Sequence, residues 1–244
     1  MSTESAVKTY ASAEEESKAF IWKVYGYMSL ALAVTGAISW YLLENPLWVI
    51  KTFYVIKPGG RIGMSMTYWV LLLAELGMVF AFVLALKKVR AVTAGAMLLA
   101  YAAMNGLTLS PLLLLYTKTS IASTFFISGG MFASFSAFGF ITKKDLSSVG
   151  AVCGMMVWGL IIAIFVNYFW LHSTQMQLVV SCIGVVIFAG LTMYDTQKIK
   201  QLNVLGNAGT EEDTKEALNG ALTLYLDFIN MFLFLLRILG SRRS

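Results

Sequence analysis

The sequence has little charge for its length. Only 13% of its 244 residues are charged and 58% are hydrophobic, whereas a soluble domain carries about 25% charged residues. A surface exposed to water needs more charged side chains than this chain can supply. The mean hydropathy is +0.74, and the apolar residues stand in long runs. These features exclude a soluble protein and predict a membrane protein that crosses the bilayer several times.

Residues that carry catalytic and metal chemistry are also scarce. The only cysteines, Cys153 and Cys182, lie inside apolar runs and lack the C-x-x-C spacing of a redox motif. The single histidine, His172, cannot form a histidine metal cluster alone. The sequence contains no cofactor motif, phosphate-binding loop or nucleophile constellation, so we expect no enzyme activity and no cofactor. The net charge of +5 does not call for a nucleic-acid partner, because basic residues at span ends match anionic lipid headgroups.

Seven stretches are long enough to cross a bilayer core, which needs roughly 20 helical residues. They are residues 24–43, 67–86, 91–115, 121–141, 149–170, 177–197 and 221–240. Most connections between them are short, so neighbouring helices should be antiparallel. The predicted fold class is an all-α integral membrane protein. Its domains are a polar, mobile cytoplasmic tail over residues 1–20 and one seven-helix transmembrane domain over residues 21–244.

The connection before the last span is the only long polar insertion between spans. Thr210, followed by Glu211, Glu212 and Asp213, resembles a capping box with acids in the first helical turn. We therefore predict one helix over residues 211–240 that begins outside the bilayer and then enters it. Gly220 is expected to weaken this helix where it crosses the interface.

The distribution of lysine and arginine predicts the orientation. Eleven of the eighteen basic residues fall on the side of the N-terminus if seven spans are present. The N-terminus is therefore predicted to be cytoplasmic. Arg237, Arg242 and Arg243 at the end of the chain do not fit this count, because a seventh span places them on the far side. A re-entrant last helix, which would return them to the cytoplasm, is the alternative.

Small residues crowd the fourth predicted span. They are Gly129, Gly130, Ala133, Ser134, Ser136, Ala137 and Gly139. Such residues let helix backbones approach closely in lipid, so we interpret this stripe as a packing surface.

Three carboxylates lie inside apolar spans: Glu75, Asp195 and Asp227. An acid at mid-bilayer costs at least a few kcal/mol, so such groups face a cavity or a partner and mark function. Asp195 and Asp227 lie on consecutive antiparallel helices, near the connection that joins them, and are expected to meet. Their alternative interpretation is a hydrogen-bonded staple between two packed helices.

A pair of carboxylates in a low dielectric cannot ionise fully at low cost, so we expect the two aspartates to share a proton and titrate as a unit. Loss of that proton would make the helices repel. The pair could also bind calcium, although two carboxylates make an incomplete shell for an ion that takes 6–8 oxygens. Intramembrane aspartyl proteolysis is disfavoured, because Asp195 and Asp227 lack the Gly-x-Gly-Asp arrangement of such proteases.

Other polar residues stand near these acids at helical spacing. Glu75 could line the same pathway or hydrogen-bond to Asn105 or Thr108 of the third span. Oxygen donors flank the aspartates on their own helices. They are Thr192, three residues before Asp195, and Thr223 and Asn230, on either side of Asp227.

The aspartates stand in two motifs that resemble the closing motifs of the Bax-inhibitor-like (transmembrane BAX inhibitor motif) family. Residues 193–199 read MYDTQKI, and residues 224–232 read LYLDFINMF. Three further segments agree with the family: GLTLSP at 106–111, FGFITKKDL at 138–146 and LAE at 73–75. The resemblance covers nearly the whole chain past residue 20 and is close to the bacterial inner-membrane branch.

The resemblance implies seven helices with the last one ringed by the other six, in a bacterial inner membrane. It also implies a pH-sensitive calcium leak controlled by an aspartate pair, which maps to Asp195 and Asp227. Some family members place an arginine at the end of the second span to engage that pair. Here Lys87 and Lys88 stand there, and a lysine lacks the bidentate fork of a guanidinium.

Two functions therefore follow from the sequence. The first is a passive, pH-gated calcium or cation leak, with calcium as the permeating or weakly bound ion. The second is a regulatory partner or inhibitor of a membrane-bound protease or stress machinery, which some bacterial relatives modulate. In that case residues 1–20 and 201–219 would form the contact surface, and the aspartates would only staple helices.

Overall fold

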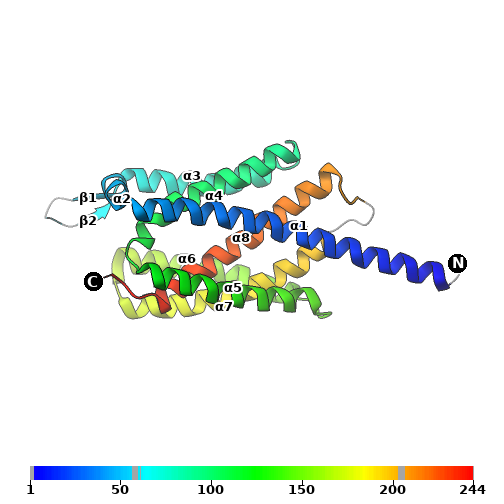
Figure 1. Cartoon of the computed structure of the whole chain (residues 1–244). Helices are drawn as coiled ribbons and strands as arrows, with labels where there is room; N and C mark the ends of the chain where they lie inside the picture. The colour runs from blue at the N-terminus through cyan, green and yellow to red at the C-terminus, as the bar shows by residue number, and fades with distance from the viewer. Residues whose placement is uncertain (1–2, 57–59, 61, 203–206, 244) are drawn as a thin grey trace. The chain divides into compact units, whose positions relative to one another are not determined.

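The computed structural model describes residues 3–56, 60, 62–202 and 207–243, with side chains from residue 15 onward. Its elements in chain order are α1 (Thr3–Glu44), α2 (Pro46–Phe53), β1 (Tyr54–Ile56), β2 (Ile62–Met64), α3 (Met66–Ala85), α4 (Ala91–Leu113), α5 (Lys118–Ile141), α6 (Ser147–Val166), the π-helix η1 (Asn167–Leu171), α7 (Thr174–Leu202) and α8 (Glu211–Leu239) (Figure 1). Seven helices are long and apolar enough to cross a membrane. The predicted all-α membrane fold is confirmed.

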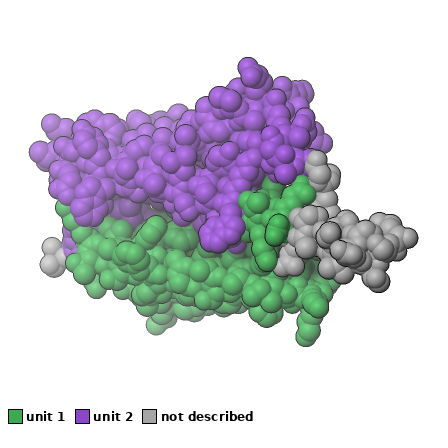
Figure 2. Space-filling model, turned by 45° about the vertical axis from the view of Figure 1, so that its right-hand side comes forward, with its two compact units in different colours: residues 1–21, 118–205, 223–241 green, residues 22–117, 206–222, 242–244 purple. Residues whose placement is uncertain are grey.

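The chain forms two compact units, which Figure 2 shows in different colours. In the first unit (residues 1–21, 118–205 and 223–241), α7 packs against both α5 and α6. In the second unit (residues 22–117, 206–222 and 242–244), α3 packs against α4, and the short α2 packs against both. Helices α1 and α8 each contribute residues to both units.

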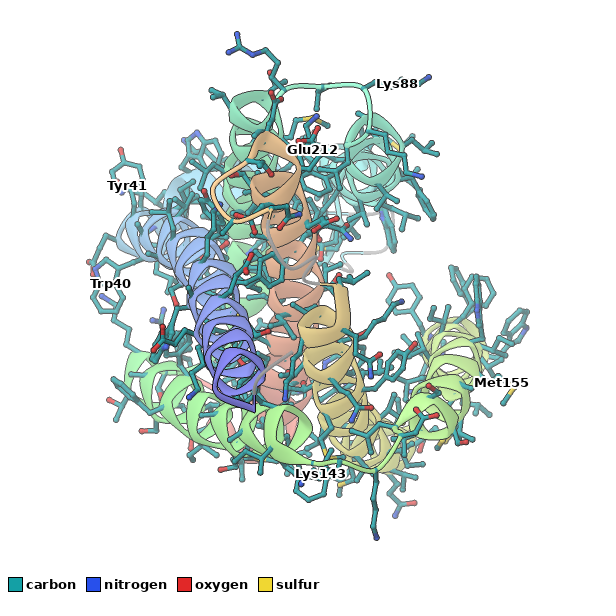
Figure 3. The ribbon with its side chains drawn as sticks, turned by 90° about the vertical axis from the view of Figure 1, so that its right-hand side faces the viewer. Trp40, Tyr41, Lys88, Lys143, Met155 and Glu212 are labelled. Atoms are coloured by element: carbon teal, nitrogen blue, oxygen red, sulfur yellow. The ribbon has the colours of Figure 1, made fainter. Side chains whose placement is uncertain are left out.

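The apolar faces of several helices remain exposed, as lipid contact requires. Met155, Trp158 and Ile162 on α6 are 62–70% exposed, and Met155 points away from its helix in Figure 3. Trp40 and Tyr41, near the end of α1, also project outward (Figure 3). Helix α8 differs, because 61% of its most apolar stretch is buried, the largest share among the seven spanning helices. Such burial is expected of a central helix.

Helix α8 begins where the sequence predicted. The hydroxyl Oγ1 of Thr210 accepts a hydrogen bond from the backbone N–H of Asp213, 3.2 Å away. The carboxylate of Asp213 in turn accepts the backbone N–H of Gly209 at 3.1 Å. The helix continues through Gly220 without a break. Gly220 is buried, and packing therefore supports the helix at this glycine.

Residues at both ends of α8 make contacts within the second unit. At the start of α8, the Glu211 carboxylate accepts the backbone N–H of Ala91, the first residue of α4, at 3.0 Å. Beyond the end of α8, Arg242 pairs as an isolated β-bridge with Tyr116, which follows α4. Helix α8 is continuous over Glu211–Leu239 and is long and apolar enough to cross a membrane. The side of the membrane on which the C-terminal arginines lie stays a prediction.

Two segments of the chain differ from the sequence prediction. Residues 3–20, which the sequence predicted as a polar tail, are helical and continuous with the first span in α1. The segment is rich in Ala, Glu and Lys and has no Gly or Pro before Gly26, which lets the helix of the span continue. The described part of the connection between the first two spans also contains secondary structure. It forms α2 and an antiparallel hairpin that pairs Tyr54 with Met64.

The small-residue stripe of α5 packs closely at only one end. A Cβ added to Gly139 would collide with the backbone of Met193 on α7, and the hydroxyl of Ser136 lies 2.8 Å from the hydroxyl of Thr196. By contrast, Gly129 and Gly130 have open space where a Cβ would stand. The predicted close approach of helices is therefore confirmed for the last two turns of α5.

Candidate functional site

Asp195 on α7 and Asp227 on α8 form a side-chain hydrogen bond with each other. Both residues belong to the first unit. Asp227 is buried and Asp195 is half-buried. The Oδ2 atom of Asp227 is buried and has no hydrogen-bond partner in the part of the chain that the structure describes. The meeting of the two acids that the sequence predicted is confirmed.

The packing of α7 turns Asp195 toward α8. Its neighbours Met193 and Thr196 contact α5, where Gly139 and Ser136 leave room for them. The ring of Tyr194 packs against Gly150 of α6 and fills the space that a side chain at residue 150 would occupy. The residues beside Asp195 pack against α5 and α6, and the Asp195 carboxylate itself interacts with Asp227 on α8.

A positive charge stands one helical turn beyond Asp195. Lys198 interacts electrostatically with Asp195, and its Nζ lies 5.7 Å from the centre of the Tyr194 ring. Lys87 and Lys88, at the end of the second predicted span, are exposed in the second unit. Figure 3 shows Lys88 reaching away from the turn that joins α3 to α4. The cation that interacts with Asp195 is Lys198 of the first unit.

Glu75 on α3 forms a second buried polar cluster, in the second unit. One carboxylate oxygen accepts a hydrogen bond from the Asn105 amide, and the other accepts the Thr108 hydroxyl at 2.8 Å. Tyr101 donates a further side-chain hydrogen bond. The three donors lie along one face of α4, at i, i+4 and i+7. The hydrogen bonds that the sequence predicted for Glu75 are present, and Tyr101 is an added partner.

Two of the remaining predicted pathway residues, Thr192 and Asn230, use their polar groups within their own helices. The Thr192 hydroxyl donates to the carbonyl of Phe188 at 2.7 Å, and the Asn230 amide donates to the carbonyl of Leu226 at 2.8 Å. Thr192 is fully buried, whereas Thr223 and Asn230 are half-buried. The oxygen atoms of these side chains are still able to accept a hydrogen bond or an ion. A lining role for them therefore stays a prediction.

Comparison with known proteins identifies the family. A family model described as "Inhibitor of apoptosis-promoting Bax1" matches residues 17–244. The chain belongs to this Bax inhibitor family. The "Inner membrane protein YbhL" of Escherichia coli (strain K12) is 40% identical over 231 residues, which are 92% of each chain. An uncharacterized protein of Borreliella burgdorferi is 39% identical over 225 residues, covering 92% of this chain and 93% of that protein.

The length of these matches means that the whole seven-helix body is shared with relatives. An uncharacterized protein of Rickettsia prowazekii is 38% identical over 245 residues, covering 100% of this chain and 97% of that one. The resemblance inferred from the two aspartate motifs is therefore confirmed, and the chain is a membrane protein of the Bax inhibitor family.

One buried polar neighbour of the aspartates in this Bax inhibitor family protein was missed by the sequence analysis. Gln197 is buried, donates through Nε2 to the carbonyl of Lys144 and accepts the N–H of Leu146 at Oε1, both at 2.9 Å. The amide thus fixes the connection between α5 and α6 to α7, two residues past Asp195. A glutamine at the end of an apolar run was the available signal. Its partners were not predictable, because they are backbone groups far away in sequence.

The acids do not assemble into a larger metal cluster. In the described ranges, no group of three or more His, Cys, Asp or Glu side chains stands close enough to hold a metal ion. The donors available beside the aspartate pair are thus two carboxylates with hydroxyl and carbonyl oxygens. Such a set provides fewer charged ligands than a tight calcium site uses.

Proposed function

We propose that this chain is a pH-sensitive passive leak for calcium or related cations in the bacterial inner membrane, gated by Asp195 and Asp227. The observation that carries the proposal is the hydrogen bond between these two carboxylates inside spanning helices. The inner-membrane location rests on the printed name of the Escherichia coli relative. The proposal assigns no catalytic reaction and no resident cofactor to the chain.

The gating follows from elementary electrostatics. A hydrogen bond between two carboxyl groups requires one proton to be shared, and this bond holds α7 to α8. As the pH rises and that proton leaves, two negative charges face each other in a low dielectric and repel. The helices then separate, and the same charges attract a divalent cation into the space between them. The proposed path is therefore closed while the proton is shared and opens as the pH increases.

Two features support a transit site over a storage site. The Oδ2 atom of Asp227 lacks a hydrogen-bond partner among the described residues, so an oxygen is available to an ion. Two carboxylates leave a calcium shell incomplete, which favours weak binding and fast release. Conduction needs both properties, because an ion must enter readily and leave readily.

The deciding experiment uses purified protein alone. The full chain is reconstituted in vesicles, calcium is placed on one side, and flux is followed with a calcium-sensitive dye at several pH values. We expect flux that rises with pH over protein-free vesicles. Absence of flux from correctly inserted protein would overturn the proposal and favour the regulatory partner of a membrane protease.

A further inference from the structure

A basic cavity lies in the first unit, where the connection between α5 and α6 meets the last turns of α7. Its volume is about 300 Å³. Its lining includes Lys143 and Lys144 from the connection, Lys200 from α7, and Gln197, Asp145 and Ser17. Figure 3 shows Lys143 in the connection that follows α5. The proposed leak does not use this cavity.

The wall of the cavity is held in a fixed shape. The buried Gln197 amide bonds to the backbone of Lys144 and Leu146, both at 2.9 Å. The hydroxyl of Thr142 accepts the N–H of Lys144 at 3.3 Å. These hydrogen bonds fix the backbone beside Lys143 and Lys144 in one conformation. A backbone that is already ordered lowers the entropy cost of binding an anion.

The positive charge of the cavity is not neutralised from within. The one acid in its lining, Asp145, accepts the backbone N–H of Ser147 at 2.9 Å and its hydroxyl at 2.6 Å. These hydrogen bonds lower the pKa of Asp145, and they direct its carboxylate to the start of α6. Lys143 and Lys144 form no ion pair with any residue in the described part of the chain.

The third lysine is already oriented. Lys200 Nζ donates to the carbonyl of Phe140 at 3.1 Å and lies 4.5 Å from the centre of the Phe140 ring. An ammonium group has three donors, so two remain for a ligand. The cavity thus carries three lysine ammonium groups and one carboxylate, which is already hydrogen-bonded to Ser147. This excess of positive charge suits an anion with several acceptor oxygens, such as phosphate.

The position of the cavity indicates whether a bound phosphate would belong to a lipid headgroup or to a free ion. Gly139 and Phe140 belong to the last turn of α5, and Lys200 belongs to the last turn of α7. Both helices are spanning helices, so the cavity lies at the depth of lipid headgroups, where basic pockets between helices recognise anionic lipids. We propose that this cavity binds the headgroup phosphate of an anionic phospholipid through Lys143, Lys144 and Lys200.

The test compares two double variants of the full chain that remove the same charge. K143Q/K144Q changes the cavity, and K87Q/K88Q changes the exposed lysines of the connection between α3 and α4. Each protein is purified in detergent and titrated with phosphatidylglycerol or phosphatidylcholine, and bound lipid is counted by native mass spectrometry. We expect the wild type to prefer phosphatidylglycerol. K143Q/K144Q should bind it about 20-fold more weakly, and K87Q/K88Q should stay within about twofold of the wild type.

Three results would overturn the proposal. Undiminished phosphatidylglycerol binding by K143Q/K144Q would exclude the cavity, and an equal loss in K87Q/K88Q would indicate a general attraction to basic residues. If K143Q/K144Q does not fold, K200Q replaces it, with an expected loss of about fivefold. Inorganic phosphate is then tested alone: protection of Lys143 and Lys144 from an amine-reactive reagent without lipid would assign the cavity to free phosphate and overturn the lipid assignment. None of these readouts depends on calcium flux.

Discussion

Asp195 and Asp227 hydrogen-bond to each other across the contact between α7 and α8. Only one of the two carboxyl groups can donate, so the bond exists while the pair holds a proton. Asp195 is half-buried, which gives the pair a route for proton exchange, whereas Asp227 is 4% exposed. One carboxyl group of the pair is therefore buried, and the other is able to exchange protons with its surroundings.

Replacing either aspartate by asparagine tests the proposed gate. Asp195→Asn or Asp227→Asn removes the repulsion and half of the charge that attracts the cation. Each variant should therefore lose the pH dependence of calcium flux in the range where the wild type titrates. Flux measured against pH in vesicles checks this, with Asp145→Asn as a control carboxylate outside the pair. If both variants keep the wild-type profile, the aspartates act only as a staple between helices.

Glu75 provides a second test, because it lies in the other compact unit. Glu75→Gln removes a charge but keeps an oxygen that can accept from Asn105 or Thr108. If Glu75 lines the path, flux should fall while its pH midpoint stays nearly unchanged. Glu75→Ala should in addition lower stability by about 1–2 kcal/mol, because Asn105 and Thr108 lose their acceptor. A large shift of the midpoint in Glu75→Gln would instead indicate direct coupling to the aspartate pair.

Local signals in the sequence predicted the spans and several contacts. Apolar runs located all seven spanning helices, and the Thr210 to Asp213 segment located the start of α8. The Glu75 hydrogen bonds were predictable because an acid in an apolar span needs donors, and the adjacent span offers Asn105 and Thr108 among its polar residues.

Contacts that depend on tertiary packing were not predictable in the same way. Tyr101 was missed because a tyrosine in an apolar run also fits a lipid-facing position, and its hydroxyl becomes informative only when α3 lies beside α4. The hairpin of β1 and β2 was missed because each strand has only three residues. Runs this short carry almost no periodic signal.

The orientation of the chain follows from its basic residues and can be measured directly. A reporter fused after Lys88 or Lys144 should report the cytoplasm, and one fused after Lys118 should report the far side. The contact of Arg242 with Tyr116 adds a further expectation, since it places the C-terminal segment beside the connection between α4 and α5. A reporter after Arg243 should therefore agree with the one after Lys118. The opposite pattern would place the aspartate pair in the external half of the membrane.

The packing of α5 on α7 gives a prediction with an internal control. At Gly139 a Cβ would collide with the backbone of Met193, which cannot move aside as a side chain can, whereas at Gly130 the same space is open. Gly139→Ala should therefore separate the helices and lower stability by about 1–3 kcal/mol. Gly130→Ala on the same helix should be neutral or gain up to about 1 kcal/mol from helix propensity. Thermal unfolding in detergent compares the two variants, and equal unfolding temperatures would mean that α5 and α7 are less closely packed than the structure indicates. Because Met193 is two residues from Asp195, Gly139→Ala should also disturb the aspartate pair, and its calcium flux should depend less steeply on pH than that of Gly130→Ala.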